Sequence, residues 1–256
     1  MNTSFADIEK KENRKDLIIS ICVFLSGFSC FAQLYYFQPL LPDLAKDFIL
    51  SASESSFAIS FSTLGMVFGL FTTMFVADRI PRKKMIGTGL LSSSIFSVAA
   101  SFSPTFLPLI LLSAAKGFLL SGATSVSMAY IAEEVSSRNK GKIMGLYIAG
   151  NALGGMAGRV ISSWIGALYT WRIASVSIGL ICALFAILFL LFSPRSTNFM
   201  PRKESFHTLI IANLQLITSK ALIPFYLTGG LILGVFVSLY NYLGVYLTKA
   251  PFNFLE

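Results

Sequence analysis

Charged residues are scarce in this sequence. Asp, Glu, Lys and Arg make up 12% of its 256 residues, whereas soluble domains carry about 25%. The single histidine, His207, leaves little material for histidine-based catalysis or metal binding. The cysteines all fall within apolar runs, which favours core positions over disulfides or a metal site: Cys22, Cys30 and Cys182. No H-E-x-x-H, G-x-S-x-G, Walker or Rossmann motif occurs, so an enzyme is not expected.

Long apolar runs are abundant instead, and hydrophobic residues make up 55% of the chain. A bilayer core requires about 20 apolar residues per helix. A lipid-exposed span must satisfy its own backbone hydrogen bonds, so each run is predicted to be an α-helix. The fold class expected is therefore all-α integral membrane. Seven spans are predicted, at residues 17–38, 55–77, 85–103, 106–131, 143–164, 173–193 and 222–247.

Lysine and arginine are distributed unevenly around these spans. Three of them fall on one side: Lys46, Arg172 and Lys249. Most of the others fall on the side that includes the N-terminus, and cytoplasmic loops are the ones enriched in Lys and Arg. We therefore expect the N-terminus in the cytoplasm. The net charge of +8 is explained in the same way, and no nucleic-acid partner is expected.

The predicted spans divide the chain into four parts. Residues 1–16 form a cytoplasmic segment, and residues 17–193 form a six-helix bundle. Residues 194–221 form a basic cytoplasmic linker, in which the apolar-periodic stretch 209–217 is predicted to be a helix on the membrane surface. Residues 222–256 contain the seventh transmembrane helix and a truncated C-terminus.

The connection between the second and third spans, residues 77–85, reads ADRIPRKKM. A positive-inside loop explains its cations but not an acid at the membrane edge. The connection resembles the signature of the major facilitator superfamily, G-x-x-x-D-R-x-G-R-[RK]-[RK]. Five positions match, and Met74 and Pro81 stand at the two glycine positions. The resemblance implies that the acid interacts with a helix of a C-terminal half. The matching residues are Asp78, Arg79, Arg82, Lys83 and Lys84.

The fifth span contains GLYIAGNALGGMAGR, residues 145–159. Small residues four apart form a smooth helix face that another helix can approach closely, and ordinary helix packing explains each glycine alone equally well. The stretch resembles a motif of superfamily antiporters ending in G-P-x-x-G-G, with Asn151 where proline is usual. The resemblance implies that this face packs against the opposite half of a transporter. The glycines are Gly145, Gly150, Gly154, Gly155 and Gly158.

Further similarity lies in YYFQPLLPDL (35–44), AYIAEEV (129–135) and WRIA (171–174). Together these stretches are similar to the arabinose-efflux-permease-like, YnfM-type branch of the superfamily, which implies a multi-pass protein of the bacterial cytoplasmic (inner) membrane. The resemblance implies secondary transport of a small molecule, of efflux type and coupled to protons, with no cofactor and no metal. It covers only the first part of a two-half family chain, so a truncated chain that is inactive alone is expected. Half of a split transporter, completed by a separate C-terminal half, and a non-transporting seven-helix scaffold are the alternatives.

Two basic residues lie within spans, where a charge is costly. Arg159 is either a ligand or gate residue facing a central pathway, or a side chain that snorkels to the outer interface. Lys116 binds an anionic substrate, responds to protons, or reaches water at the outer leaflet. The resemblance implies an arginine three positions earlier that serves proton coupling, where this chain has Ser113.

Several polar side chains fall on helices that line the cavity in the superfamily. They are candidates for hydrogen bonds to a substrate, although interhelical hydrogen bonds account for each equally well. Glu133 and Glu134 are expected to form a charge cluster with Arg138 at the cytoplasmic end of the fourth span. The expected partners are a small-molecule substrate, protons and membrane lipid. The cavity candidates are Gln33, Tyr36, Asn151, Tyr240 and Asn241.

Overall fold

The computed structural model describes residues 5–201 and 206–247. Within these ranges the regular structure is helical, with no strand. The chain forms two compact units, Met1–Pro201 and Arg202–Glu256. Each unit is described by itself.

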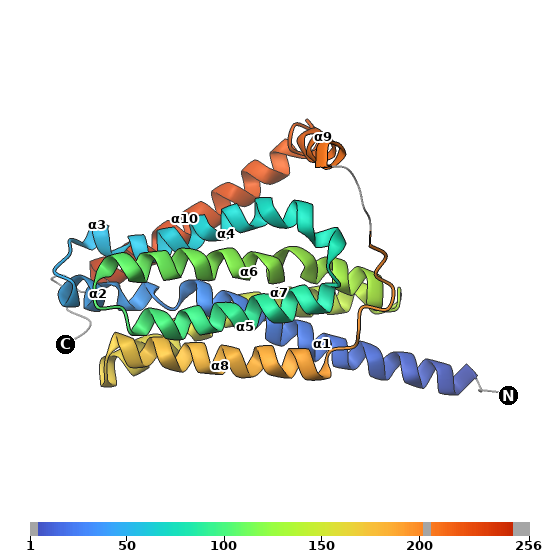
Figure 1. Ribbon diagram of the computed structural model, residues 1–256, viewed down its shortest axis with the longest axis horizontal. Coiled ribbons are helices and arrows are strands. Elements are labelled where there is room, and N and C mark those ends of the chain that lie inside the picture. Colours follow the sequence, from blue (N-terminus) through green and yellow to red (C-terminus); the bar gives the residue numbers. More distant parts are fainter. Residues whose placement is uncertain (1–4, 202–205, 248–256) are drawn as a thin grey trace. The chain divides into compact units, whose positions relative to one another are not determined.

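Six long helices build the first unit and run side by side (Figure 1). Helix α1 lies along α7 and also contacts α8, α6 packs between α4 and α5, and α5 contacts α8. Four short elements lie in the connections: η1 (Gln38–Leu40), α2 (Leu41–Asp47), α3 (Ala52–Ser55) and η2 (Ala77–Arg79). The long helices are α1 (Phe5–Tyr35), α4 (Phe57–Val76), α5 (Arg82–Ser101), α6 (Phe106–Glu134), α7 (Lys140–Leu168) and α8 (Trp171–Phe192).

These six helices occupy the first six predicted spans. Four stretches are long and apolar enough to cross a membrane by length and hydropathy: Glu12–Asp47, Ala52–Arg79, Phe106–Glu134 and Trp171–Phe192. Helices α5 and α7 are less apolar because each begins with lysines or arginine and contains several serines or glycines. Both are nevertheless packed among the other four. Hydropathy alone therefore understates the number of helices in the bundle.

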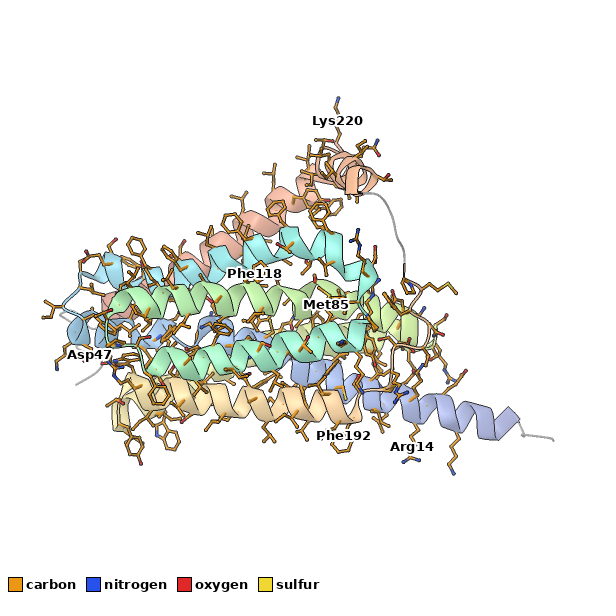
Figure 2. The ribbon with its side chains drawn as sticks, viewed as in Figure 1. Arg14, Asp47, Met85, Phe118, Phe192 and Lys220 are labelled. Atoms are coloured by element: carbon orange, nitrogen blue, oxygen red, sulfur yellow. The ribbon has the colours of Figure 1, made fainter. Side chains whose placement is uncertain are left out.

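The connections gather at two ends of the bundle. One end carries η1, α2, α3 and the short turns before α6 and α8. The other carries η2, the turn before α7 and the start of α1, which extends beyond its neighbours (Figure 1). Figure 2 shows Arg14 at this second end and Asp47 at the first. The loops predicted to be cytoplasmic thus share one end, called here the basic end.

The glycines of α7 allow it to approach α1 closely. A Cβ atom on Gly150 would lie 2.6 Å from the carbonyl oxygen of Phe24, and one on Gly158 would lie 2.7 Å from the Cα of Ala32. Gly154 meets the backbone of Phe28 in the same way. The expectation that this face packs against an opposite half is therefore wrong for these three glycines, because α1 of the same bundle already occupies it.

The other two glycines of the stretch have different surroundings. A Cβ on Gly155 would make ordinary contacts, 3.5 Å from both Tyr35 and Arg159. A Cβ on Gly145 would have no neighbour within 4 Å. The close contact with α1 thus covers the later turns of the stretch and not its start.

The second unit consists of α9 (Phe206–Ile217) and α10 (Ile223–Leu247), joined by a short turn. Helix α9 contains the apolar-periodic stretch 209–217, and α10 covers the seventh predicted span. The division between the units, at Pro201, falls inside the segment interpreted as a linker.

Replacing Gly154 by alanine should lower the free energy of unfolding of the bundle by about 1–3 kcal/mol, because the new methyl group overlaps the backbone of Phe28. Thermal unfolding in detergent measures this effect. The matched control is Gly145→Ala, which meets open space and should gain about 0.5–1 kcal/mol from helix propensity. Equal effects of the two substitutions would contradict the packing described.

Candidate functional site

Arg82 is the centre of a charge cluster at the basic end. Its side chain is 9% exposed. Its Nη2 donates to Asp78 Oδ1 at 2.9 Å and to Glu133 Oε1 at 3.0 Å, and its Nη1 donates to the carbonyl of Ala77 at 2.6 Å. The guanidinium thereby joins the start of α5 to η2 and to the last turn of α6. Ion pairs as shielded as these depend on each partner being present.

The remaining basic residues of this loop divide into two groups. The Nζ of Lys83 donates to the carbonyl of Ser193 at 2.5 Å, and its backbone N–H donates to Ser196 Oγ at 3.0 Å. Arg79 and Lys84 are exposed. Within the described residues, Arg82 and Lys83 therefore form hydrogen bonds to other elements of the bundle, whereas Arg79 and Lys84 lie at its surface.

The segment after α8, residues 193–199, crosses the same end and is called here the 193–199 strap. The carboxylate of Glu134 is 0% exposed and accepts hydrogen bonds from Thr197 Oγ1 at 2.8 Å and from the backbone N–H of Asn198 at 2.7 Å. Lys15 of α1 forms an ion pair with the same carboxylate at 2.8 Å. The strap therefore connects α1, α5 and α6.

Sequence reasoning anticipated part of this cluster. It placed the two glutamates at the end of the fourth span. It did not anticipate Lys15, Thr197 or Asn198, which lie 63 to 119 residues from Glu134. No sequence pattern marks such distant partners. The structure pairs Glu133 with Arg82 and Glu134 with Lys15, and the expected participation of Arg138 stays a prediction.

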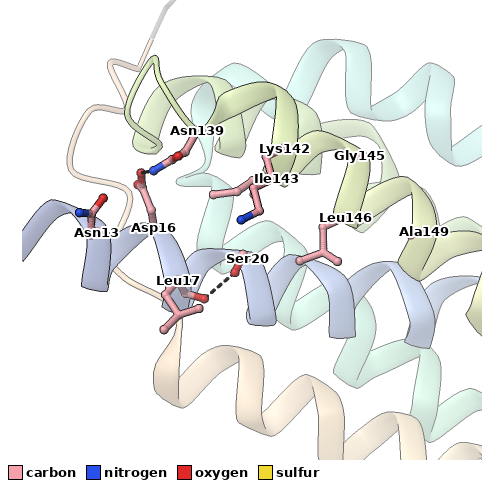
Figure 3. A pocket seen from close by; sticks show the side chains of 10 residues that line it. All are labelled: Asn13, Asp16, Leu17, Ser20, Asn139, Lys142, Ile143, Gly145, Leu146 and Ala149. Atoms are coloured by element: carbon pink, nitrogen blue, oxygen red, sulfur yellow. Dashed lines mark hydrogen bonds between the residues drawn. The ribbon is translucent and has the colours of Figure 1, made fainter.

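A groove of about 530 Å³ opens between α1 and α7 at the basic end (Figure 3). At one end of the groove, the carboxylate of Asp16 accepts hydrogen bonds from Ser136 Oγ at 2.5 Å and Asn139 Nδ2 at 2.8 Å. The helices contact each other tightly from Gly150 onward but not at Gly145, so the groove marks where they separate. Its lining residues are Asn13, Asp16, Leu17, Ser20, Asn139, Lys142, Ile143, Gly145, Leu146 and Ala149.

Lys116 is buried in the middle of α6, and only 1% of it is exposed. Its Nζ lies 4.4 Å from the centre of the Tyr36 ring and 4.9 Å from that of Phe37. Among the described residues, no hydrogen-bond partner is found for this atom. The interpretation that Lys116 reaches water at the outer leaflet is therefore wrong, because the turn after α1 covers it.

Gln33 and Tyr36 belong to a chain of hydrogen bonds between helices. The hydroxyl of Tyr36 pairs with Ser175 Oγ of α8 at 2.8 Å. Ser97 of α5 donates to Gln33 Oε1 at 3.1 Å. Both side chains are buried. In this structure the two candidates connect α1 to α5 and α8, as the interhelical alternative describes.

Arg159 is half-buried near the opposite end of the bundle. Its Nε donates to Gln38 of η1, and its Nη1 donates to the carbonyl of Gly155 at 2.8 Å. The guanidinium also lies over the Tyr35 ring, 4.5 Å from its centre. These contacts orient the Arg159 side chain from α7 towards α1. Its role as a ligand or gate residue and its role as a side chain that snorkels to the outer interface both remain predictions.

The other polar candidates differ in their placement. Asn151 lies at the contact of α7 with α1, where its Oδ1 is next to Gly27. Tyr240 and Asn241 fall on α10, but their side chains lie outside the described residues. Among the described residues, none of the predicted pathway residues lines the groove at the basic end. Within the described part of the chain, no group of His, Cys, Asp or Glu is suited to a metal ion.

Comparison with known proteins decides the family. A family model described as Major Facilitator Superfamily matches residues 20–255. The chain belongs to the major facilitator superfamily. The match covers both units, and it agrees with the resemblance carried by the loop at Asp78 and the glycines of α7.

Three relatives illustrate the similarity of this superfamily member. An uncharacterized transporter of Buchnera aphidicola subsp. Schizaphis graminum is 35% identical, over 96% of this chain and 59% of its own length. The inner membrane transport protein YnfM of Escherichia coli is 35% identical over 92% and 56%. The uncharacterized MFS-type transporter YybF of Bacillus subtilis is 32% identical over 92% and 58%. The chain thus spans 56% to 59% of the length of these relatives.

Family membership establishes the general class of this protein. It is an all-α, multi-pass bacterial membrane protein of a transporter family and not an enzyme.

Replacing Arg82 by glutamine should destabilise the bundle by about 1–2 kcal/mol, because the buried guanidinium loses its charged hydrogen bonds to the partly exposed carboxylates of Asp78 and Glu133. Thermal unfolding in detergent at low and high salt measures the change. Lys84→Gln is the matched control, since Lys84 lies two residues away and is exposed. A stability loss from Lys84→Gln as large as that from Arg82→Gln would mean that net charge, not the cluster, is responsible.

Proposed function

We propose that this chain forms the N-terminal bundle of a secondary transporter that moves a small molecule across the bacterial cytoplasmic membrane by alternating access. In such transporters two bundles rock around a site near the middle of the bilayer. The transporter is of efflux type and is coupled to protons. Residues 1–16 and the segment 194–221 lie in the cytoplasm, because the basic loops share one end of the bundle.

The observation that carries the proposal is the cluster of Asp78, Arg82 and Glu133. A bundle that rocks as a unit must hold its helices together at the end that opens and closes. The cluster joins η2, α5 and α6 at that end with hydrogen bonds of 2.6–3.3 Å. The carboxylate of Asp78 is 41% exposed, which leaves it accessible to a group from a second bundle.

The arginine of α7 supports a pathway role. Arg159 combines a fixed direction with partial exposure, and a positioned guanidinium recognises carboxylate or phosphate groups well. We assign it to the outer part of the pathway, together with Gln38 and Tyr35, which hold it. Gln33, Tyr36 and Asn151 support this region from α1 and α7, and Tyr240 and Asn241 are assigned to the pathway from the side of α10.

A second bundle is required by this mechanism. It is carried either on the same polypeptide or on a separate chain, and residues 1–256 by themselves are expected to be inactive. A non-transporting scaffold is the competing function. The glycine face of α7 does not decide between them, because α1 occupies it. The buried, unpaired Lys116 favours transport, since ionisable groups placed within a membrane domain generally serve a function.

Inside-out membrane vesicles containing residues 1–256 together with the C-terminal bundle of the Escherichia coli relative provide the test. A pH-sensitive dye reports proton release when panels of small organic anions and cations are added. We expect a response only when both parts are present, and a loss of that response in Arg82→Gln. A response from residues 1–256 alone would refute the need for a second bundle. If both parts are shown to be inserted in the membrane and the dye still gives no response, the scaffold function is favoured.

A further inference from the structure

Lys116 has no counter-charge in the described part of the bundle. Its Nζ is buried and lacks a hydrogen-bond partner there. The two aromatic rings stabilise an ammonium group by about 0.5–2 kcal/mol, whereas an unpaired buried ion costs several kcal/mol. A permanent positive charge at this position is therefore not balanced by its surroundings.

The groups that face Lys116 are apolar or weakly polar. The turn after α1 contributes Tyr36 and Phe37, and α8 contributes the buried thiol of Cys182. Helix α4 has no ionisable residue, and those of α5 lie in its first turn. On α7, Arg159 is bound to Gln38, and η2 lies at the basic end. The acids whose side chains are described lie towards the ends of the bundle: Glu12, Asp16, Asp43, Asp47, Glu54, Asp78, Glu133 and Glu134.

The neighbouring turn of α6 shows a second unsatisfied group. Ser113, three residues before Lys116, is also buried, and its hydroxyl has no partner among the described residues. Two polar side chains without partners, one helical turn apart, are unusual because buried polar groups are normally hydrogen-bonded. They mark this turn of α6 as a candidate position for a ligand.

The burial of Lys116 limits what that ligand is. The rings of Tyr36 and Phe37 lie over its Nζ, and 1% of the residue is exposed. An organic or inorganic anion needs space beside the nitrogen, and the rings occupy part of that space. A proton needs none, and a single water molecule that enters transiently can deliver it.

We propose that Lys116 is a proton-binding site of the bundle. While the rings of Tyr36 and Phe37 cover its Nζ, the side chain is a neutral amine in this proposal. When water enters, the amine takes a proton from a hydronium ion and becomes an ammonium group, and the reverse step returns the proton to water. Because the ammonium form is better solvated in a hydrated conformation, proton binding shifts the bundle towards that conformation. The coupling of this step to substrate movement rests on the proposed transport function.

Nuclear magnetic resonance of the 256-residue chain in lipid nanodiscs, labelled at its lysine side chains, tests the site directly. Ordinary lysines have a pKa of about 10.4 and therefore remain ammonium groups until the pH approaches that value. We expect the Lys116 signal to change from that of an amine to that of an ammonium group as the pH is lowered. The other lysines should remain ammonium groups throughout the same pH range. Lys116→Gln should remove that signal, and Lys46→Gln, at an exposed position, should remove an ordinary one.

Two results would overturn the proposal. One is a wild-type spectrum in which every lysine titrates like Lys46, which can be read without any variant if Lys116→Gln fails to fold. The other is a Lys116 signal that stays ammonium and shifts only when phosphate or acetate is added, which would make the position an anion site.

The coupling role is separated from the transport function by the vesicle assay with the second bundle. Lys116→Gln should lose proton release while substrate exchange across the membrane continues. If the wild type shows no transport, the proposed function fails but the resonance titration still decides the proton site. Proton release that is unchanged in Lys116→Gln would remove Lys116 from the coupling step and leave the transport function intact.

Discussion

The close approach of α1 and α7 is the constraint on which the arrangement of the bundle depends. Backbone contact at Gly150, Gly154 and Gly158 fixes the second half of α1 in place. The residues that follow on α1 then reach the interior, where Gln33 and Tyr36 bond to α5 and α8 and Phe37 covers Lys116. Towards the basic end the same two helices separate and leave the groove above Asp16. The same helix pair thus encloses the interior where the two helices are in contact and leaves an open groove at the basic end, where they separate.

The two ends of the bundle are held by different physical means. The basic end depends on ion pairs around Arg82 and Glu134, whose strength varies with salt and with partial exposure. The opposite end depends more on apolar packing of η1, α2 and Trp171, supported by an ion pair of Arg172 with Asp47 at 3.1 Å. Charged contacts can break and reform with little change in packing, so the basic end is the more easily rearranged of the two.

The sequence could predict the helices and the membrane class, because twenty-residue apolar runs have few other structural solutions. It could also predict that Asp78 and Arg82 matter, since an acid among cations is visible locally. It could not predict which helix fills the glycine face, because a flat face accepts any helix backbone and the choice is made by the tertiary fold. Nor could it predict the cover over Lys116, which depends on how the chain turns after Tyr35. The partners of Glu134 were missed for the same reason, since Lys15 and Thr197 are brought to it only by folding.

The strap at residues 193–199 has a mechanical consequence. The chain leaves α8 and is bonded to Lys83, Glu134 and Glu133 before it continues into the second unit. A force transmitted along the backbone from that unit therefore reaches the ends of α5 and α6 before it reaches α8. The strap is in this sense an anchor of the chain on α5 and α6.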